Sequence, residues 1–132
     1  MRQIALAAAL CVFSLPVFAQ GAEIEDVISS QLDAFRADDF GRAFTFAAPG
    51  IQRMFGTPRN FGAMVRNGYP MVHRPDTVRF GALEQENGVL RQRVMIRDAT
   101  GTFHALDYDM IEGPEGWKIG AVRLVEMPEV GV

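Results

Sequence analysis

The sequence predicts an α+β domain in which N-terminal helices pack on one face of a curved, cone-like sheet of four antiparallel strands. Three observations lead to this fold class. After an expected signal peptide over residues 1–19, apolar residues recur at helical spacing through the first half of the remaining chain. From Asp76 onwards the apolar period changes to two, which is typical of strands. Glycine-bearing turns then divide the second half into strand-length segments, which favours antiparallel neighbours.

Residues 1–19 are predicted to be a cleaved signal peptide. Arg2 supplies a positive start, and an uninterrupted apolar run covers Ile4 to Phe13. Val17-Phe18-Ala19 places small or branched side chains at the two positions that a signal peptidase reads, with Ala22 as the weaker alternative cleavage point. We therefore expect a periplasmic or secreted protein of the bacterial envelope.

Residues 20–132 are expected to form a single domain without a membrane span. The one cysteine, Cys11, leaves with the leader, so neither a disulfide nor a thiolate metal site is expected. The net charge of −3 becomes −4 once Arg2 is removed, which argues against nucleic acid and anionic membranes as partners. No cofactor and no metal is expected, because the sequence contains neither a phosphate-binding glycine loop nor a cluster of Cys and His residues.

The first two helices are expected over residues 23–37 and 39–48. Acidic residues occupy the first turn of the first helix, and Asp38 or Asp39 would cap the second. Pro49-Gly50 would end that second helix. The side chains expected to face the core are Ile24, Val27, Ile28, Leu32 and Phe35 in the first helix, and Phe40, Ala43, Phe44 and Ala47 in the second.

A single helical turn is expected over residues 51–55, and a third helix over residues 59–67. Thr57-Pro58 is a helix-start pattern, and Gly68 provides the stop. Residues 69–75 are bracketed by prolines and are expected to run extended. The inward side chains of these two segments are expected to be Ile51, Met54, Phe55, Phe61, Met64 and Val65.

The strands alternate apolar and polar residues and are joined by turns that contain glycine where a hairpin needs a positive φ. They are expected over residues 77–84, 88–98, 102–112 and 117–126.

The hairpin formed by the two middle strands can be placed in register. If Ala99-Thr100-Gly101 form the loop, Gln92 lies opposite Tyr108 and Ile96 lies opposite His104 on an otherwise apolar inner face. A slip by one residue would bring arginines into the core, so this register is strongly favoured. The outer face then carries the pairs Arg91 with Asp109, Arg93 with Asp107, and Arg97 with Phe103.

Two groups of polar residues are candidate functional sites. The first lies on the inner face or in the proline-bracketed segment and would bind a small ligand. The second lies on the outer face, where alternating charge suits a homodimer. Cross-strand ion pairs explain the two outer carboxylates, so no catalytic residue and no metal ligand is assigned. The ligand-binding candidates are Tyr69, His73, Gln92, His104 and Tyr108, and the interface candidates are Arg91, Arg93, Arg97, Asp107 and Asp109.

Residues 24–126 resemble the bacterial domain-of-unknown-function family numbered 4864. The resemblance is most specific in IQRMFGTP and in the following NFGAMVRNGYPMV. The last strand, GWKIGAVRL, is similar to the end of many nuclear-transport-factor-2-like domains. That wider superfamily implies a curved sheet wrapped around helices to form a cone with a cavity, and it includes both enzymes and non-catalytic binding modules. The narrower family implies no particular activity.

Three functions of different classes remain open at this point. The leading hypothesis is an exported, non-catalytic module that binds a small apolar or amphipathic ligand between helices and sheet. The second is an interaction or homodimerisation domain that uses the outer sheet face. The third is a cofactor-free enzyme with His104 or His73 as the general base and Tyr108 as the oxyanion donor.

Overall fold

The computed structural model describes residues 17–127, in which a group of helices precedes one antiparallel sheet. The expected signal peptide lies outside the described residues except for its last three, which begin the first helix. The helices are α1 (Val17–Arg36), α2 (Phe40–Thr45), α3 (Pro49–Phe55), α4 (Pro58–Gly68) and α5 (Pro70–His73). The strands are β1 (Pro75–Glu86), β2 (Val89–Asp98), β3 (Phe103–Gly113) and β4 (Gly116–Val125).

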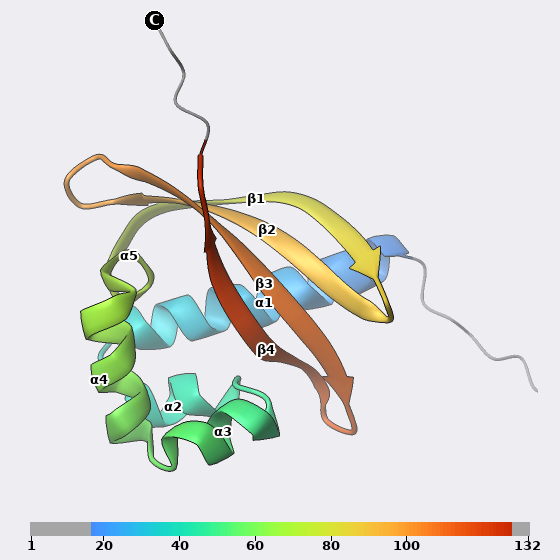
Figure 1. The fold of residues 1–132 in the computed structure, drawn as a ribbon, viewed down its shortest axis with the longest axis horizontal. Helices are drawn as coiled ribbons and strands as arrows, with labels where there is room; N and C mark the ends of the chain where they lie inside the picture. Colours follow the sequence, from blue (N-terminus) through green and yellow to red (C-terminus); the bar gives the residue numbers. More distant parts are fainter. Residues whose placement is uncertain (1–16, 128–132) are drawn as a thin grey trace, which may run out of the picture.

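The helices cover one face of the sheet, which confirms the α+β architecture (Figure 1). The sheet has the order β1-β2-β3-β4 and is not closed, so β1 and β4 are its edges. α1 runs across the sheet, while α2, α3 and α4 gather at one end of it (Figure 1). The core lies between the helices and the inner face of the sheet, because Ile28, Leu32 and Phe35 of α1 belong to one buried cluster with Val94 and Leu106 of the middle strands.

The predicted register of the middle hairpin is confirmed. Gln92 pairs with Tyr108, and Ile96 pairs with His104. Tyr108 is completely buried and Gln92 is 1% exposed, so both face the helices. Leu90 pairs with Met110 in the same set. The alternation of apolar and charged residues therefore decides which face of β2 and β3 the helices cover.

The helix starts also follow local chemistry. Asp39 caps α2 by accepting a hydrogen bond from the backbone N–H of Arg42 (3.1 Å). Thr57 caps α4 in the same way through the N–H of Asn60 (3.2 Å), with Pro58 in the first helical position. The cap at Thr57 was expected from the sequence, and Asp39 is one of the two residues that the sequence offered for α2.

Two expectations about the segments that contain proline are wrong. Pro49-Gly50 begins α3 rather than ending α2, because the chain between these helices leaves helical geometry to pair with β4. Residues 69–75 are not extended throughout, since Pro70 occupies the first position of α5. Proline restricts the residue before it but is itself compatible with the first turn of a helix. α5 consequently buries Met71 and Val72.

The expectation that Met54 faces the core is also wrong, because this side chain is 75% exposed. α3 has only seven residues and lies at the edge of the helical layer. Ile51 and Phe55 pack against the core from one side of this short helix, which leaves Met54 largely exposed beside them.

Gly62 is required where α4 approaches α2. A Cβ at this position would lie 2.6 Å from Cδ1 of Phe40. The Phe40 ring is itself held in place, with its centroid 6.2 Å from Phe35 and stacked 5.9 Å from His73. Any larger residue at position 62 must therefore displace a packed aromatic ring.

We predict that Gly62→Ala lowers the free energy of unfolding by about 1–3 kcal/mol, the usual cost of overpacking a core. Gly68→Ala is the matched control in the same helix, because a Cβ there meets no atom within 4 Å. The control should be neutral or stabilising by up to about 1 kcal/mol. Urea denaturation measures both variants, and equal midpoints would contradict the close contact with Phe40.

Candidate functional site

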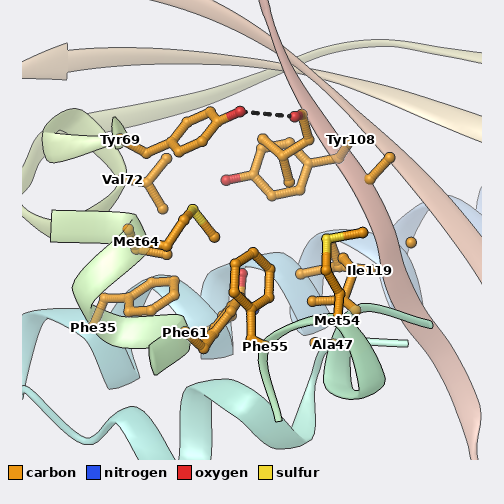
Figure 2. A pocket seen from close by; sticks show the side chains of 16 residues that line it. Phe35, Ala47, Met54, Phe55, Phe61, Met64, Tyr69, Val72, Tyr108 and Ile119 are labelled. Atoms are coloured by element: carbon orange, nitrogen blue, oxygen red, sulfur yellow. Dashed lines mark hydrogen bonds between the residues drawn. The ribbon is translucent and has the colours of Figure 1, made fainter. Parts of the chain in front are cut away.

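A largely apolar pocket of about 270 Å³ lies between the helices and the β3–β4 side of the sheet (Figure 2). Its volume exceeds the roughly 150 Å³ of an apolar cavity that holds benzene. α1, α3, α4 and α5 contribute to its walls, together with β3 and β4. The lining consists of Gln31, Phe35, Ala47, Ile51, Met54, Phe55, Phe61, Met64, Val65, Tyr69, Val72, Tyr108, Ile119, Gly120, Ala121 and Val122.

Backbone pairing holds one wall of the pocket against β4. The N–H of Ala48 donates to the carbonyl of Ile119 (2.8 Å), and the N–H of Ile119 donates to the carbonyl of Phe46 (2.9 Å). Gln52 reinforces this segment, since its Nε2 donates to the carbonyls of Phe44 (3.0 Å) and Ala47 (3.1 Å). Edge strand β4 therefore positions the connection between α2 and α3, and with it the floor of the pocket.

Aromatic side chains form the wall on the helical side. The ring of Phe61 lies 5.8 Å from that of Phe35, 5.4 Å from that of Phe44 and 5.8 Å from that of Phe55. These tilted and edge-on contacts are favourable geometries for aromatic pairs. The wall is therefore both apolar and well packed.

Three polar side chains line the pocket, and two of them have backbone partners. The hydroxyl of Tyr69 donates to the carbonyl of Val122 (3.3 Å), as the dashed line in Figure 2 marks. Nε2 of Gln31 donates to the carbonyl of Ala43 (3.1 Å). The third polar side chain is Tyr108, whose hydroxyl points into the space between the other lining residues (Figure 2).

The hydroxyl of Tyr108 has no hydrogen-bond partner among the described residues, although its side chain is fully buried. Burial raises the pKa of this phenol above its ordinary value of 10.0, and the nearby Tyr69 adds to the shift. The group is therefore a neutral hydrogen-bond donor at physiological pH. Buried polar groups normally have partners, so this one requires an explanation.

Gln92 lies on the inner face but outside the pocket lining. Its Nε2 donates to the carbonyls of Gly81 (3.0 Å) and Arg93 (2.9 Å). The amide therefore faces β1 and does not pair with the hydroxyl of Tyr108, although the two residues are opposite each other in the register. The sequence indicated the common face but not the direction of the amide.

The two histidines also lie outside the pocket lining. Nε2 of His73 is 2.7 Å from Oδ1 of Asp38, a carboxylate that also pairs with Arg74 (2.9 Å). These hydrogen bonds, with that of His73 the largest influence, lower the pKa of Asp38. The pair ties α5 to the end of α1.

His104 makes a similar contact with a carboxylate near the tip of the middle hairpin. Its Nε2 is 2.8 Å from Oδ2 of Asp98. The hydroxyl of Thr100 and the ring of His104 both bond this carboxylate and lower its pKa. Of the five predicted ligand-binding residues, the structure thus brings Tyr69 and Tyr108 together and places the other three elsewhere.

The outer face carries the predicted charge ladder. Nε of Arg91 lies 2.9 Å from Oδ1 of Asp109, and Nε of Arg93 lies 2.6 Å from Oδ1 of Asp107. Arg123 from β4 also binds Asp109 (2.9 Å), a partner that the reading of the single hairpin missed. Asp109 is partly buried, which raises its pKa, but the two arginines outweigh this effect and the net shift is downward.

Arg97 stands apart from the ladder. Its guanidinium is 3.8 Å from Oδ2 of Asp76 and lies over the ring of Phe103 at 5.9 Å from the centroid. Phe103 is 60% exposed. The outer face therefore combines charges that are largely paired within the chain with one exposed aromatic ring.

Gln31 is the polar lining residue that sequence reasoning missed. It lies within the apolar stripe of α1, between Ile28 and Phe35, and is 3% exposed. A polar residue three positions after one core residue and four before another falls on the buried face of a helix. That spacing was the signal in the sequence.

Within residues 17–127, no helix is both long and apolar enough to cross a membrane. In the same part of the chain, no three His, Cys, Asp or Glu side chains gather where they could hold a metal ion.

The model of a family described as a domain of unknown function, DUF4864, matches residues 17–132. The match includes every described helix and strand. Comparison with curated proteins and comparison with solved structures give no match.

We predict that Tyr108 makes the folded protein less stable in alkaline solution. Above pH 10 the phenol ionises in the unfolded chain while burial keeps it protonated in the folded one, since the folded pKa is the higher. The free energy of unfolding should therefore fall by up to about 1.4 kcal/mol per pH unit on this account. Tyr108→Phe should lack this part of the decline, as urea unfolding between about pH 9 and pH 12 would show. Parallel pH profiles for the two proteins would contradict the raised pKa.

Proposed function

This chain belongs to the DUF4864 family, a domain of unknown function, and on that premise we propose that it is an exported, non-catalytic module that binds one small apolar or amphipathic molecule. The observation that carries the proposal is the pocket of about 270 Å³ between helices and sheet. Ligand sites in proteins are concave and mostly apolar, with a few polar groups that fix the orientation of the ligand. Tyr108 supplies such a group here, beside Tyr69 and Gln31, whose donors already bond backbone carbonyls.

The pocket chemistry supports binding more than catalysis. Its lining contains aromatic, aliphatic, amide and phenol side chains, and none that changes protonation near neutral pH. The two histidines considered as general bases are instead paired with Asp38 and Asp98 at other places in the fold. A general base must reach the proton it removes, directly or through one water.

The outer sheet face gives less support to a role in assembly. Asp107 and Asp109 already have arginine partners within the chain. A second copy would therefore have to exchange existing ion pairs rather than satisfy free charges, and exposed pairs contribute about 0–1 kcal/mol each. We place the functional site in the pocket for this reason.

Export is the part of the proposal that rests on sequence. The positive residue, apolar run and small residues of the leader are the features of a secretory signal. The domain that follows lacks cysteine, so its folding requires no disulfide chemistry in an oxidising compartment.

We predict that filling the pocket abolishes binding. Met64 lies in the pocket wall, and Met64→Trp would occupy the space that a ligand needs. Met95→Trp makes the same exchange on β2, where Met95 alternates with the buried Val94 and Ile96 and so faces away from the pocket. Native mass spectrometry of protein purified from its own envelope should show a retained small molecule on the wild type and on Met95→Trp. It should show none on Met64→Trp. Equal retention by all three proteins would place the ligand elsewhere.

We also predict that the exported protein begins at Gln20. N-terminal sequencing of material from the periplasm or the medium tests the cleavage point. Intact Met1 on a protein confined to the cytoplasm would contradict export, without bearing on the pocket.

A further inference from the structure

The hydroxyl of Tyr108 is the one buried side-chain polar atom that has no hydrogen-bond partner among residues 17–127. Its side chain is completely buried and comes from the middle of β3. Figure 2 shows this hydroxyl directed into the pocket, on the side that faces Tyr69 and Met64. A buried donor without an acceptor is costly, because it has lost its hydrogen bonds to water without replacement.

None of the neighbouring polar groups in the described part of the chain lies within hydrogen-bond distance of this hydroxyl, and their own donors bond backbone carbonyls elsewhere. Gln92 lies opposite Tyr108 in the register, but its amide donates to the carbonyls of Gly81 in β1 and of Arg93 in its own strand. The hydroxyl of Tyr69 donates to the carbonyl of Val122, and Nε2 of Gln31 donates to that of Ala43. Every other side chain in the lining is apolar.

We propose that Tyr108 determines the specificity of the pocket by donating a hydrogen bond to an uncharged oxygen of the ligand, which makes the ligand a mostly apolar ketone, aldehyde, ester or alcohol. The inference rests on the proposed binding function and adds the class of ligand. A hydrocarbon of the same size leaves the phenol without an acceptor. An oxygen-bearing ligand satisfies the hydroxyl and fills the apolar walls at the same time.

The same lining selects against an anion. No Lys, Arg or His contributes to it, so a carboxylate in the pocket would have no cation to offset the loss of its hydration. Burial also keeps the phenol protonated, so it acts as a donor throughout the physiological pH range. A fatty-acid headgroup is thus a poor occupant next to Tyr108, whereas a neutral carbonyl is a good one.

The volume limits the ligand to a small molecule. The pocket is larger than an apolar cavity that holds benzene and slightly below the usual range of drug-sized sites. A single ring with a short side chain is therefore a suitable probe. Three probes share a benzene ring with a four-carbon chain: n-butylbenzene has no polar group, butyrophenone has a neutral carbonyl next to the ring, and 4-phenylbutyrate has a carboxylate at the end of the chain.

The test is isothermal titration calorimetry of the three probes with the wild type, Tyr108→Phe and Tyr69→Phe. Tyr108→Phe should weaken butyrophenone binding about two- to twelvefold, the usual effect of losing one neutral hydrogen bond. It should leave n-butylbenzene binding unchanged or tighter, because the variant has no unpaired hydroxyl. Tyr69→Phe is the matched control, since it removes a pocket hydroxyl whose donor is already committed to Val122. The control should change the ratio of the two affinities less than Tyr108→Phe does.

A second measurement needs no variant. The infrared carbonyl stretch of butyrophenone bound to the wild type should lie at lower frequency than in hexane, because a hydrogen bond from the phenol weakens the carbonyl bond. An unshifted stretch would overturn the proposal even if a variant failed to fold.

The outcomes distinguish a wrong ligand class from a wrong binding function. If Tyr108→Phe shifts the affinities of n-butylbenzene and butyrophenone by the same factor, or if phenylbutyrate binds the wild type as tightly as butyrophenone, the assigned ligand class is wrong while binding in the pocket stands. If no probe binds the wild type, including n-butylbenzene, the proposed binding function itself fails, and the ligand class fails with it.

Discussion

The antiparallel register between β2 and β3 is the constraint on which the pocket depends. It directs Tyr108 toward the helices and its neighbours Asp107 and Asp109 away from them. The period of two leaves no intermediate arrangement, because a shift of one residue exchanges the two faces completely. The paired arginines on the outer face oppose such a shift, since it would bury their charges. One register thus separates an apolar, ligand-sized space from a solvated face of ion pairs.

Backbone pairing at the edge of the sheet holds one wall of that space in place. The chain between α2 and α3 pairs with edge strand β4 through backbone hydrogen bonds at Ala48 and Ile119. This pairing satisfies part of the strand edge, which would otherwise expose unpaired backbone groups. It also fixes short α3 at the rim of the pocket, where Phe55 and the largely exposed Met54 both contribute to the wall. The protein therefore uses one edge of an open sheet to hold the floor of the site.

The two histidines were candidate site residues in the sequence, but the fold places both of them outside the pocket lining. His73 and His104 each bind a carboxylate near the end of a secondary-structure element, Asp38 in the turn after α1 and Asp98 at the end of β2. Both contacts join segments that the fold brings together, and neither histidine lines the pocket. The polar character of the site consequently comes from phenols and an amide. A site of this kind orients a ligand by hydrogen bonds and supplies no group that titrates near neutral pH.

The sequence by itself determined the fold class, the register of the middle hairpin and the ion pairs between β2 and β3 on its outer face, because these follow from periodicity and from turn chemistry between neighbouring segments. Helix caps at Asp39 and Thr57 are local in the same sense. The tertiary structure decided which inner-face residues share a cavity, because that depends on contacts between segments far apart in the chain. Gln31 joins the lining only once α1 crosses the sheet, and Gln92 is diverted to the carbonyl of Gly81 by the path of β1. Periodicity assigns a side chain to a face, but only packing assigns it to a pocket.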